Sequence, residues 1–89
     1  MSGLRVEFDD RAARQLFKLG AVERKRIRNF VEQRLLATGN PRALGKRLAG
    51  DLSSFWRYRV GGYRILARIQ DDVLLVLVVE VGNRREVYR

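Results

Sequence analysis

The fold is decided by residues 55–69, which read FWRYRVGGYRILARI. On both sides of Gly61-Gly62, apolar residues alternate with charged ones, which is the period of a β-strand with one buried face. Two such segments joined by a two-glycine connection are typical of a tight hairpin. The stretch therefore predicts two antiparallel strands, at about 55–60 and 63–69.

The sheet is predicted to continue on both sides of this hairpin. Asp71-Asp72 is a second turn signal, and residues 73–79 read VLLVLVV, an apolar run without alternation. Such a run is expected for a central strand that is covered on both faces. Near the N-terminus, residues 4–8 read LRVEF and alternate again, which predicts one more strand.

Two helices are predicted between that first strand and the hairpin. Asp9 or Asp10 offers an N-cap for a short helix that ends at Gly20. Its apolar face is predicted to hold Ala13, Leu16 and Phe17. A longer helix should run from about residue 21 to 37 and end at Gly39-Asn40-Pro41. Its buried positions are predicted to be Ile27, Phe30, Val31 and Leu35, with Arg24, Lys25, Arg28 and Glu32 toward water.

The order of elements indicates an α+β fold. The connection from Pro41 to Asp51 contains two glycines and is too irregular to predict an element. We therefore expect an N-terminal strand and a two-helix hairpin packed on a small, mainly antiparallel four-stranded sheet. Residues 1–89 are expected to form a single domain, because a chain of this length has room for one hydrophobic core.

Composition points to an acidic partner and excludes several kinds of chemistry. The chain has 19 Lys and Arg against 10 Asp and Glu, a net charge of +9, and 16 of its cations are Arg. Arg suits phosphate because its planar fork makes bidentate contacts. Since Cys and His are both absent, disulfides, thiolate or His-based metal sites and Ser-His triads are excluded. We expect a cytoplasmic protein, because there is no signal peptide and no membrane-spanning apolar stretch.

The cations gather in one part of the sequence. Residues 41–68 contain seven cations and one anion, Asp51. Alternation places Arg57, Arg59 and Arg64 on one face of the hairpin, with Arg68 as a further candidate for that face. Like charges on one face repel unless an anion lies between them, so this face is the predicted phosphate-binding surface. The C-terminal residues Arg84, Arg85 and Tyr88 follow the apolar strand and could be delivered to the same face.

Other polar and aromatic residues have simpler interpretations. Trp56 and Tyr58 alternate with the arginines and are expected in the core rather than as platforms for bases. The run Arg24-Lys25-Arg26 is interpreted as the solvated side of the longer helix, with a contact to nucleic acid as the alternative. The aspartate pairs at 9–10 and 71–72 are interpreted as caps and turns, because adjacent Asp residues do not easily converge on one metal ion.

Three segments together resemble the RelE/ParE superfamily of type II toxins. They read KRLAGDL at 46–52, FWRYRVGGYRI at 55–65 and VGNRREVY at 81–88. The resemblance spans nearly the whole chain and implies a microbial RNase-like fold with the order β-α-α-β-β-β. In the RelE branch it implies cleavage of mRNA in the ribosomal A site without a metal or other cofactor. The expected products are a 2′,3′-cyclic phosphate and a 5′-OH.

The resemblance also implies roles for individual residues. Catalytic positions would be Arg59, Arg64, Arg84 and Tyr88. RNA-binding positions would be Lys46, Arg47, Arg57, Arg68 and Arg85. The implied partners are an acidic antitoxin, mRNA and the ribosome, with operator DNA bound only through the toxin–antitoxin complex.

Two positions depart from the pattern and leave alternatives open. Where the RelE branch has a lysine that accepts a proton, this chain has Arg59, and a guanidinium is a very poor general base. Asn83 stands where many relatives carry His. One alternative is therefore the ParE branch, whose members poison DNA gyrase without cutting RNA. Another is a non-toxic module whose basic face only binds an acidic partner.

Overall fold

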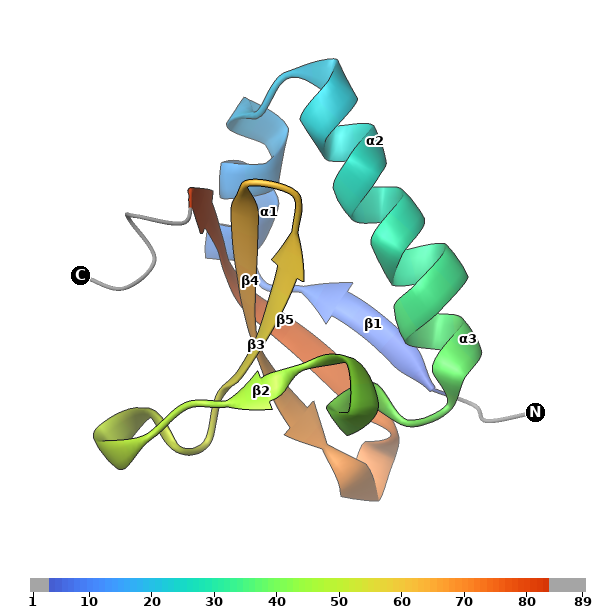
Figure 1. Ribbon diagram of the computed structural model, residues 1–89, viewed down its shortest axis with the longest axis vertical. Helices are drawn as coiled ribbons and strands as arrows, with labels where there is room; N and C mark the ends of the chain where they lie inside the picture. The colour runs from blue at the N-terminus through green and yellow to red at the C-terminus, as the bar shows by residue number, and fades with distance from the viewer. Residues whose placement is uncertain (1–3, 84–89) are drawn as a thin grey trace.

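The predicted hairpin forms the middle of the structure, a computed structural model that describes residues 4–83 (Figure 1). Its strands are β3 (Trp56–Val60) and β4 (Tyr63–Gln70), and Val60 pairs with Tyr63 across the turn. Gly61 has a φ of +60°, a left-handed conformation that costs a side-chain-bearing residue free energy. The two-glycine signal in the sequence is thus confirmed as the hairpin turn.

The sheet has five strands in the order β1-β5-β4-β3-β2, where four were predicted. β1 (Arg5–Phe8) pairs in parallel with β5 (Leu75–Asn83), and the other three pairings are antiparallel. The additional strand is β2 (Lys46–Arg47), which pairs with the start of β3. A strand of two residues has no period that a sequence can display, so only its pairing reveals it.

The helices follow the predicted ranges with one internal change. α1 covers Asp10–Lys18, and one continuous helical segment then comprises α2 (Ala21–Phe30), a π-helical turn (Val31–Leu35) and α3 (Leu36–Thr38). Gly39 ends it in the left-handed conformation, as predicted. The four predicted core positions of this segment are all buried: Ile27, Phe30, Val31 and Leu35.

The predicted apolar face of α1 was wrong in part. Ala12 is fully buried, whereas Ala13 is exposed and Phe17 is 78% exposed. The helix therefore turns Ala12 and Leu16 toward the core. Gly20 does not end α1 in a left-handed conformation, since its φ is −64° and it precedes the first residue of α2.

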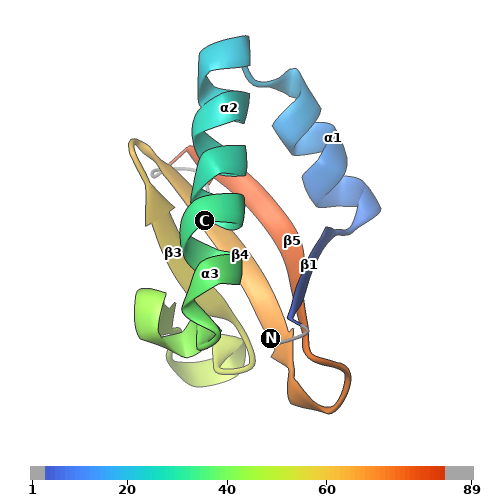
Figure 2. The same ribbon diagram turned by 90° about the vertical axis from the view of Figure 1, so that its right-hand side faces the viewer.

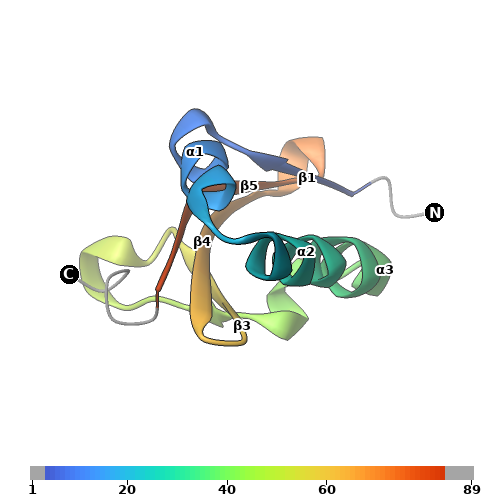
Figure 3. The same cartoon turned by 90° about the horizontal axis from the view of Figure 1, so that it is seen from above.

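α2 and α3 cover one side of β3 and β4, and α1 lies beside β5 (Figures 2 and 3). We call the side of β3 and β4 that faces α2 the inner face and the opposite side the outer face. The core between helices and sheet includes Ile27 and Leu35 from the helical segment and Tyr58, Ile65 and Val76 from the strands. Within residues 4–83, no helix has both the length and the apolar character needed to cross a bilayer.

The apolar run at 73–79 is less deeply covered than predicted. Val73 belongs to a short 3-10 turn (Asp71–Val73), and β5 begins at Leu75. Leu75, Val76 and Val78 are buried, but Leu77 and Val79 are only half-buried. One face of this strand therefore packs in the core, while the other is only partly covered.

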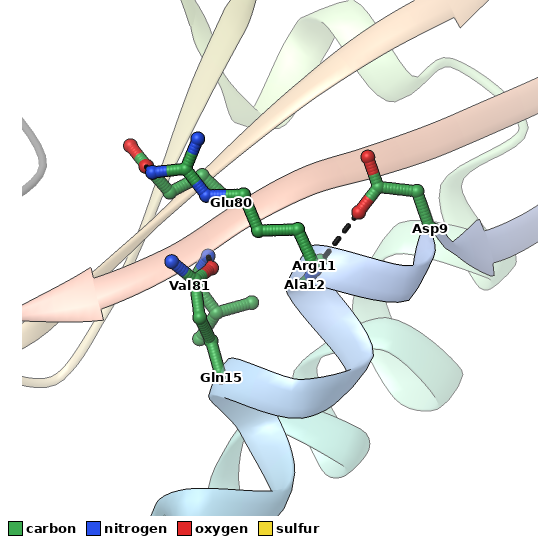
Figure 4. A network of polar contacts seen from close by, with 6 residues as sticks. All are labelled: Asp9, Arg11, Ala12, Gln15, Glu80 and Val81. Carbon is green, nitrogen blue, oxygen red and sulfur yellow. Dashed lines mark hydrogen bonds and ion pairs between the residues drawn. The ribbon is translucent and has the colours of Figure 1, made fainter.

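Two polar contacts attach α1 to β5, and a third caps the start of the helix (Figure 4). Asp9 accepts a hydrogen bond from the Ala12 N–H at 2.8 Å and caps the helix, as predicted. Arg11 forms an ion pair with Glu80 at 2.6 Å, and the Val81 N–H donates to the side-chain oxygen of Gln15 at 2.7 Å. Gln15 thereby satisfies a backbone donor of β5 beyond the end of its pairing with β1.

The connection before the hairpin is held by residues of β3 and of the 3-10 turn at 71–73. The Tyr58 hydroxyl donates to the carbonyl oxygen of Pro41 at 2.8 Å. Arg42 makes a bidentate contact with Asp71, at 2.8 and 2.7 Å, and its guanidinium lies 5.6 Å from the centre of the Trp56 ring. These contacts hold the first of two short 3-10 turns (Pro41–Leu44), which precedes β2, and the second (Gly50–Leu52) follows β2.

Candidate nucleic-acid interface

Strand pairing brings the predicted arginines together on the outer face. Arg59 is directly opposite Arg64, and Arg57 is opposite Leu66. Directly paired residues point to the same side of a sheet, so these arginines share one face. Tyr58, Val60, Ile65 and Ala67 are buried on the inner face, and the predicted division of the hairpin into two faces is confirmed.

Arg64 is the most enclosed of these cations. It is only 7% exposed, whereas Arg59 is exposed and Arg57 is half-buried. Its cross-strand neighbours are Arg59 on β3 and Gly82 on β5, and Gly82 has no side chain to occupy the outer face. A guanidinium held in place beside an exposed one can stabilise a developing negative charge without reorganising.

β2 adds a fourth cation beside these arginines. Lys46 is exposed and pairs with Arg57. Arg47 is also exposed, but its Nε donates a hydrogen bond to the carbonyl oxygen of Ser53 at 2.8 Å. One nitrogen of its guanidinium is therefore engaged with the loop before β3. The structure therefore brings Lys46, Arg57, Arg59 and Arg64 together, whereas Arg47 pairs with Trp56 and lies on the other side of β2.

Arg68 lies apart from this group. It is exposed near the far end of β4, opposite Leu77, and its guanidinium is 5.2 Å from the centre of the Phe55 ring. A hollow of about 440 Å³ surrounds it, with a floor that includes Leu66 and Val79. The lining also includes Asp9 and Glu80, so Arg68 has carboxylates in its hollow, unlike the cations that line the hollows near the hairpin turn.

Two cations that the sequence did not assign to the interface approach β3 from the helical segment. Arg26 and Arg34 line hollows that also contain Arg59. The sequence indicated a charged, solvated helix side, and periodicity alone could not show which of its residues would face β3. Their shared location with Arg59 is a result of the tertiary structure.

Residues 4–83 contain no group of three or more His, Cys, Asp or Glu side chains that could hold a metal ion.

A family model described as the ParE toxin of the type II toxin–antitoxin system parDE matches residues 6–88. The chain belongs to the RelE/ParE superfamily of type II toxins. The toxin is 30% identical to the mRNA interferase toxin RelE of Escherichia coli K12, over 93% of this chain and 87% of that relative. It is 37% identical to the toxin RelG of Mycobacterium tuberculosis, over 55% of this chain and 56% of that relative.

Solved structures agree with this membership. The toxin chain resembles the RelBE2 toxin–antitoxin complex of M. tuberculosis with a TM-score of 0.82 and 30% identity, covering 93% of both chains. It resembles the isolated E. coli RelE toxin with a TM-score of 0.73 and 27% identity, covering 96% of this chain and 90% of that one. The α+β fold implied by the sequence resemblance is thereby confirmed, with the fifth strand as an addition.

Part of the predicted site of this toxin lies outside the described residues. Arg84, Arg85 and Tyr88 belong to residues 84–89, which the structure does not describe. The last described residue, Asn83, pairs with Tyr63, next to the pairing of Gly82 with Arg64. The three tail residues therefore stay predictions, adjacent in sequence to the end of β5 at which Arg64 lies.

The aromatic residues of β3 do not offer platforms for bases on the outer face of the toxin. Tyr58 is fully buried on the inner face, and Trp56 is half-buried on the same face. Burial raises the pKa of Tyr58 to about 12, and its hydroxyl is bound to the Pro41 carbonyl. Tyr58 is therefore a core residue, as predicted, and cannot serve as a proton acceptor near neutral pH.

Proposed function

We propose that this toxin is a metal-independent endoribonuclease that cleaves mRNA on the ribosome. The observation that carries this proposal is the enclosed Arg64 beside the exposed Arg59, with Arg57 and Lys46 on the same surface. A phosphodiester presented to this surface would meet several cations in fixed positions. The E. coli relative, at 30% identity over nearly the full chain, is named an mRNA interferase.

The reaction we propose transfers the phosphate within the RNA strand. The 2′-oxygen of one nucleotide bonds to the adjacent phosphorus, and the bond to the 5′-oxygen of the next nucleotide breaks. The 2′-hydroxyl gives up its proton and the 5′-oxygen gains one, which leaves a 2′,3′-cyclic phosphate and a 5′-OH. Arg64 and Arg84 stabilise the charge on the five-coordinate phosphorus.

The remaining residues bind and orient the RNA in this proposal. Arg59 is charged at any physiological pH and acts by electrostatics rather than by proton transfer. Tyr88 stacks on or orients a base and, with a group of the ribosome, assists proton transfer. Phosphates along the strand are bound by five further cations, Lys46, Arg47, Arg57, Arg68 and Arg85.

The proposal includes partners and a place of action. A toxin of this superfamily has to be silenced in its own cell, and a cognate acidic antitoxin would complement the net charge of +9. Relatives with this fold have been solved as toxin–antitoxin complexes. Operator DNA would be bound only through such a complex. Because ribosomes are the site of action, we place the toxin in the cytoplasm.

The test is a translating-ribosome assay with purified toxin, in which new mRNA 5′ ends are mapped by primer extension and naked RNA is the control. We expect cuts within A-site codons on ribosomes, and their loss in an Arg84→Ala variant. Absence of cleavage by a folded protein would overturn the proposal.

Gyrase inhibition is the second candidate, and one observation favours it. Arg59 occupies the position where the resemblance implies a lysine that accepts a proton. An arginine is a very poor proton acceptor, so RNA cleavage lacks that general base here. A DNA supercoiling assay separates the candidates. Inhibition of gyrase without any mRNA cleavage would establish the second one.

A further inference from the structure

A groove runs along the edge of β3 between that strand and the helical segment. Two adjoining hollows, of about 330 and 260 Å³, share Phe30, Arg34 and Arg59 among their lining residues. We call them together the α2–β3 groove. It exists because β2 pairs only with the first two residues of β3, so β2 does not cover the rest of that edge.

The lining of the groove is strongly cationic. Its cations come from three elements that are far apart in the sequence: Arg26, Arg34, Lys46, Arg57 and Arg59. Within residues 4–83 no carboxylate lines it. Elsewhere on the surface, Arg11 forms an ion pair with Glu80 and Arg42 with Asp71. A concentration of cations on one surface costs free energy, and an anionic ligand bound there offsets that cost.

The two helical arginines are held toward the groove by their surroundings. The Arg26 guanidinium lies against Gly61, where an added Cβ would approach it to 2.8 Å. Arg34 belongs to the π-helical turn, in which the Leu36 N–H donates to the carbonyl oxygen of Val31, five residues back. Its guanidinium lies 5.9 Å from the centre of the Phe30 ring. π-turns within α-helices are frequent at functional sites.

The groove is continuous with the outer face. Arg57 and Arg59 point to the outer face and also line the groove. A nucleic-acid strand that contacts Arg59 on the outer face can therefore pass around the edge of β3 and continue toward Arg34. Four of the five groove cations are Arg, whose fork matches phosphate geometry. The apolar side chains of the lining are Phe30, Ala43, Leu44 and Val60, which offer few anchors for a peptide.

We propose that the α2–β3 groove is a second RNA-binding surface, which holds the phosphate backbone of a segment next to the one bound on the outer face. The inference rests on the proposed function in taking RNA as the ligand. It extends that function by adding Arg26 and Arg34, which the candidate catalytic surface does not include.

The test measures binding of a fluorescein-labelled oligouridylate by anisotropy across a range of salt concentrations. In an Arg26→Gln, Arg34→Gln double variant, we expect about tenfold weaker binding and a salt slope smaller by about 1.4, since two phosphate contacts are lost. The matched control is Arg14→Gln, Arg28→Gln, which removes the same charge from exposed positions that line neither hollow of the groove. It should change the affinity less than about twofold.

Three outcomes would overturn the proposal. The groove variant could bind RNA as tightly as the unmodified toxin, or both double variants could lose affinity equally, which would indicate an effect of net charge alone. The groove variant could also retain RNA affinity and lose only the binding of labelled polyglutamate, which would make the groove a peptide surface.

Two further measurements keep the result interpretable. Arg34→Lys retains the charge but lacks the planar fork, so its RNA affinity should lie between that of the unmodified toxin and that of the double variant. Thermal unfolding of each variant reports on the fold. The binding assay needs neither ribosomes nor cleavage, so loss of the groove proposal and loss of the proposed RNase activity are distinguishable.

Discussion

The two faces of the β3–β4 hairpin have opposite environments although they belong to the same strands. On the inner face, Tyr58, Ile65 and Ala67 are at most 1% exposed and pack under the helical segment. On the outer face, Arg57, Arg59 and Arg64 form a cationic surface, and no α-helix of residues 4–83 lies above it. Because consecutive residues of a strand point to opposite faces, substitutions at adjacent positions can alter stability and ligand binding separately.

The largest expected effect is on the outer face. Arg64→Ala should reduce mRNA cleavage on ribosomes by about 100- to 1,000-fold, because a fixed donor to the transition state is lost. Single-turnover cleavage, followed by primer extension, measures it, with Arg28→Ala on α2 as the control for lost charge. Full cleavage by an Arg64→Ala, Arg84→Ala double variant would contradict the assigned roles.

Ile65 follows Arg64 in β4 and is buried on the inner face, so its substitution tests the contribution of that face to stability. Ile65→Ala should lower the free energy of unfolding by about 2–5 kcal/mol, because a buried side chain is truncated and leaves a cavity. Urea denaturation measures this change. RNA affinity below the unfolding transition should be unaffected, since Ile65 does not reach the outer face.

If Ile65→Ala proves too unstable to purify, Ile65→Val provides the same comparison, with a cost of about 0.5–1.5 kcal/mol. A loss of RNA affinity in the folded Ile65→Val variant would break the separation of the two faces.

A smaller effect is expected from the hydroxyl of Tyr58. Tyr58→Phe removes the hydrogen bond to the Pro41 carbonyl and should cost about 1–2 kcal/mol. Burial raises the folded-state pKa to about 12 from an ordinary value of 10.0. The folded state therefore keeps its proton where the unfolded state loses it, and the stability is fully present below pH 10 and declines as the pH rises toward 12.

Thermal unfolding between neutral and strongly alkaline pH measures this dependence. The difference in Tm between the unmodified toxin and Tyr58→Phe should shrink as the pH rises through that range. A difference that stays constant would show that the hydroxyl does not couple to folding.

The smallest effect on stability is expected from a substitution at the exposed residue Asp71. The hydrogen bond from Arg42 lowers the pKa of Asp71 below its ordinary value of 3.8. A carboxylate with a depressed folded-state pKa stabilises the fold above its unfolded pKa, and this contribution is lost as the pH falls through the folded value. Asp71→Asn should therefore lower the Tm slightly at neutral pH and not in strong acid.

Asp72→Asn, in the same 3-10 turn, is the matched control for that measurement. A pH-independent effect of Asp71→Asn would mean that the bidentate contact with Arg42 does not contribute through charge. RNA affinity should be unchanged in both variants, because this turn is remote from Arg59 and Arg64 in the sheet.

The elements with strong local patterns were predicted well. The hairpin, its two-glycine turn, the long helical segment and its end at Gly39 all follow from residues close together in sequence. The errors lie where local patterns are ambiguous. In α1, Ala12 and Ala13 are the same residue type, and only docking against β5 decides which of them is buried.

The part of the candidate site that lies on the hairpin could be predicted from the alternation of apolar and charged residues. Placing Arg57, Arg59 and Arg64 on one face needs only the period of a strand and the hairpin register. The approach of Lys46 to Arg57 was not predictable in this way, because β2 is defined by two residues and a long-range pairing.

The sequence by itself determined the class of fold, the cationic character of the chain and which hairpin residues share a face. Local propensities and the two-residue period of a strand are sufficient for each of these. Only the tertiary structure decided that Arg64 is enclosed while Arg59 is exposed, and that Arg26 and Arg34 reach the edge of β3. These properties depend on contacts between distant segments, and no local pattern encodes such contacts.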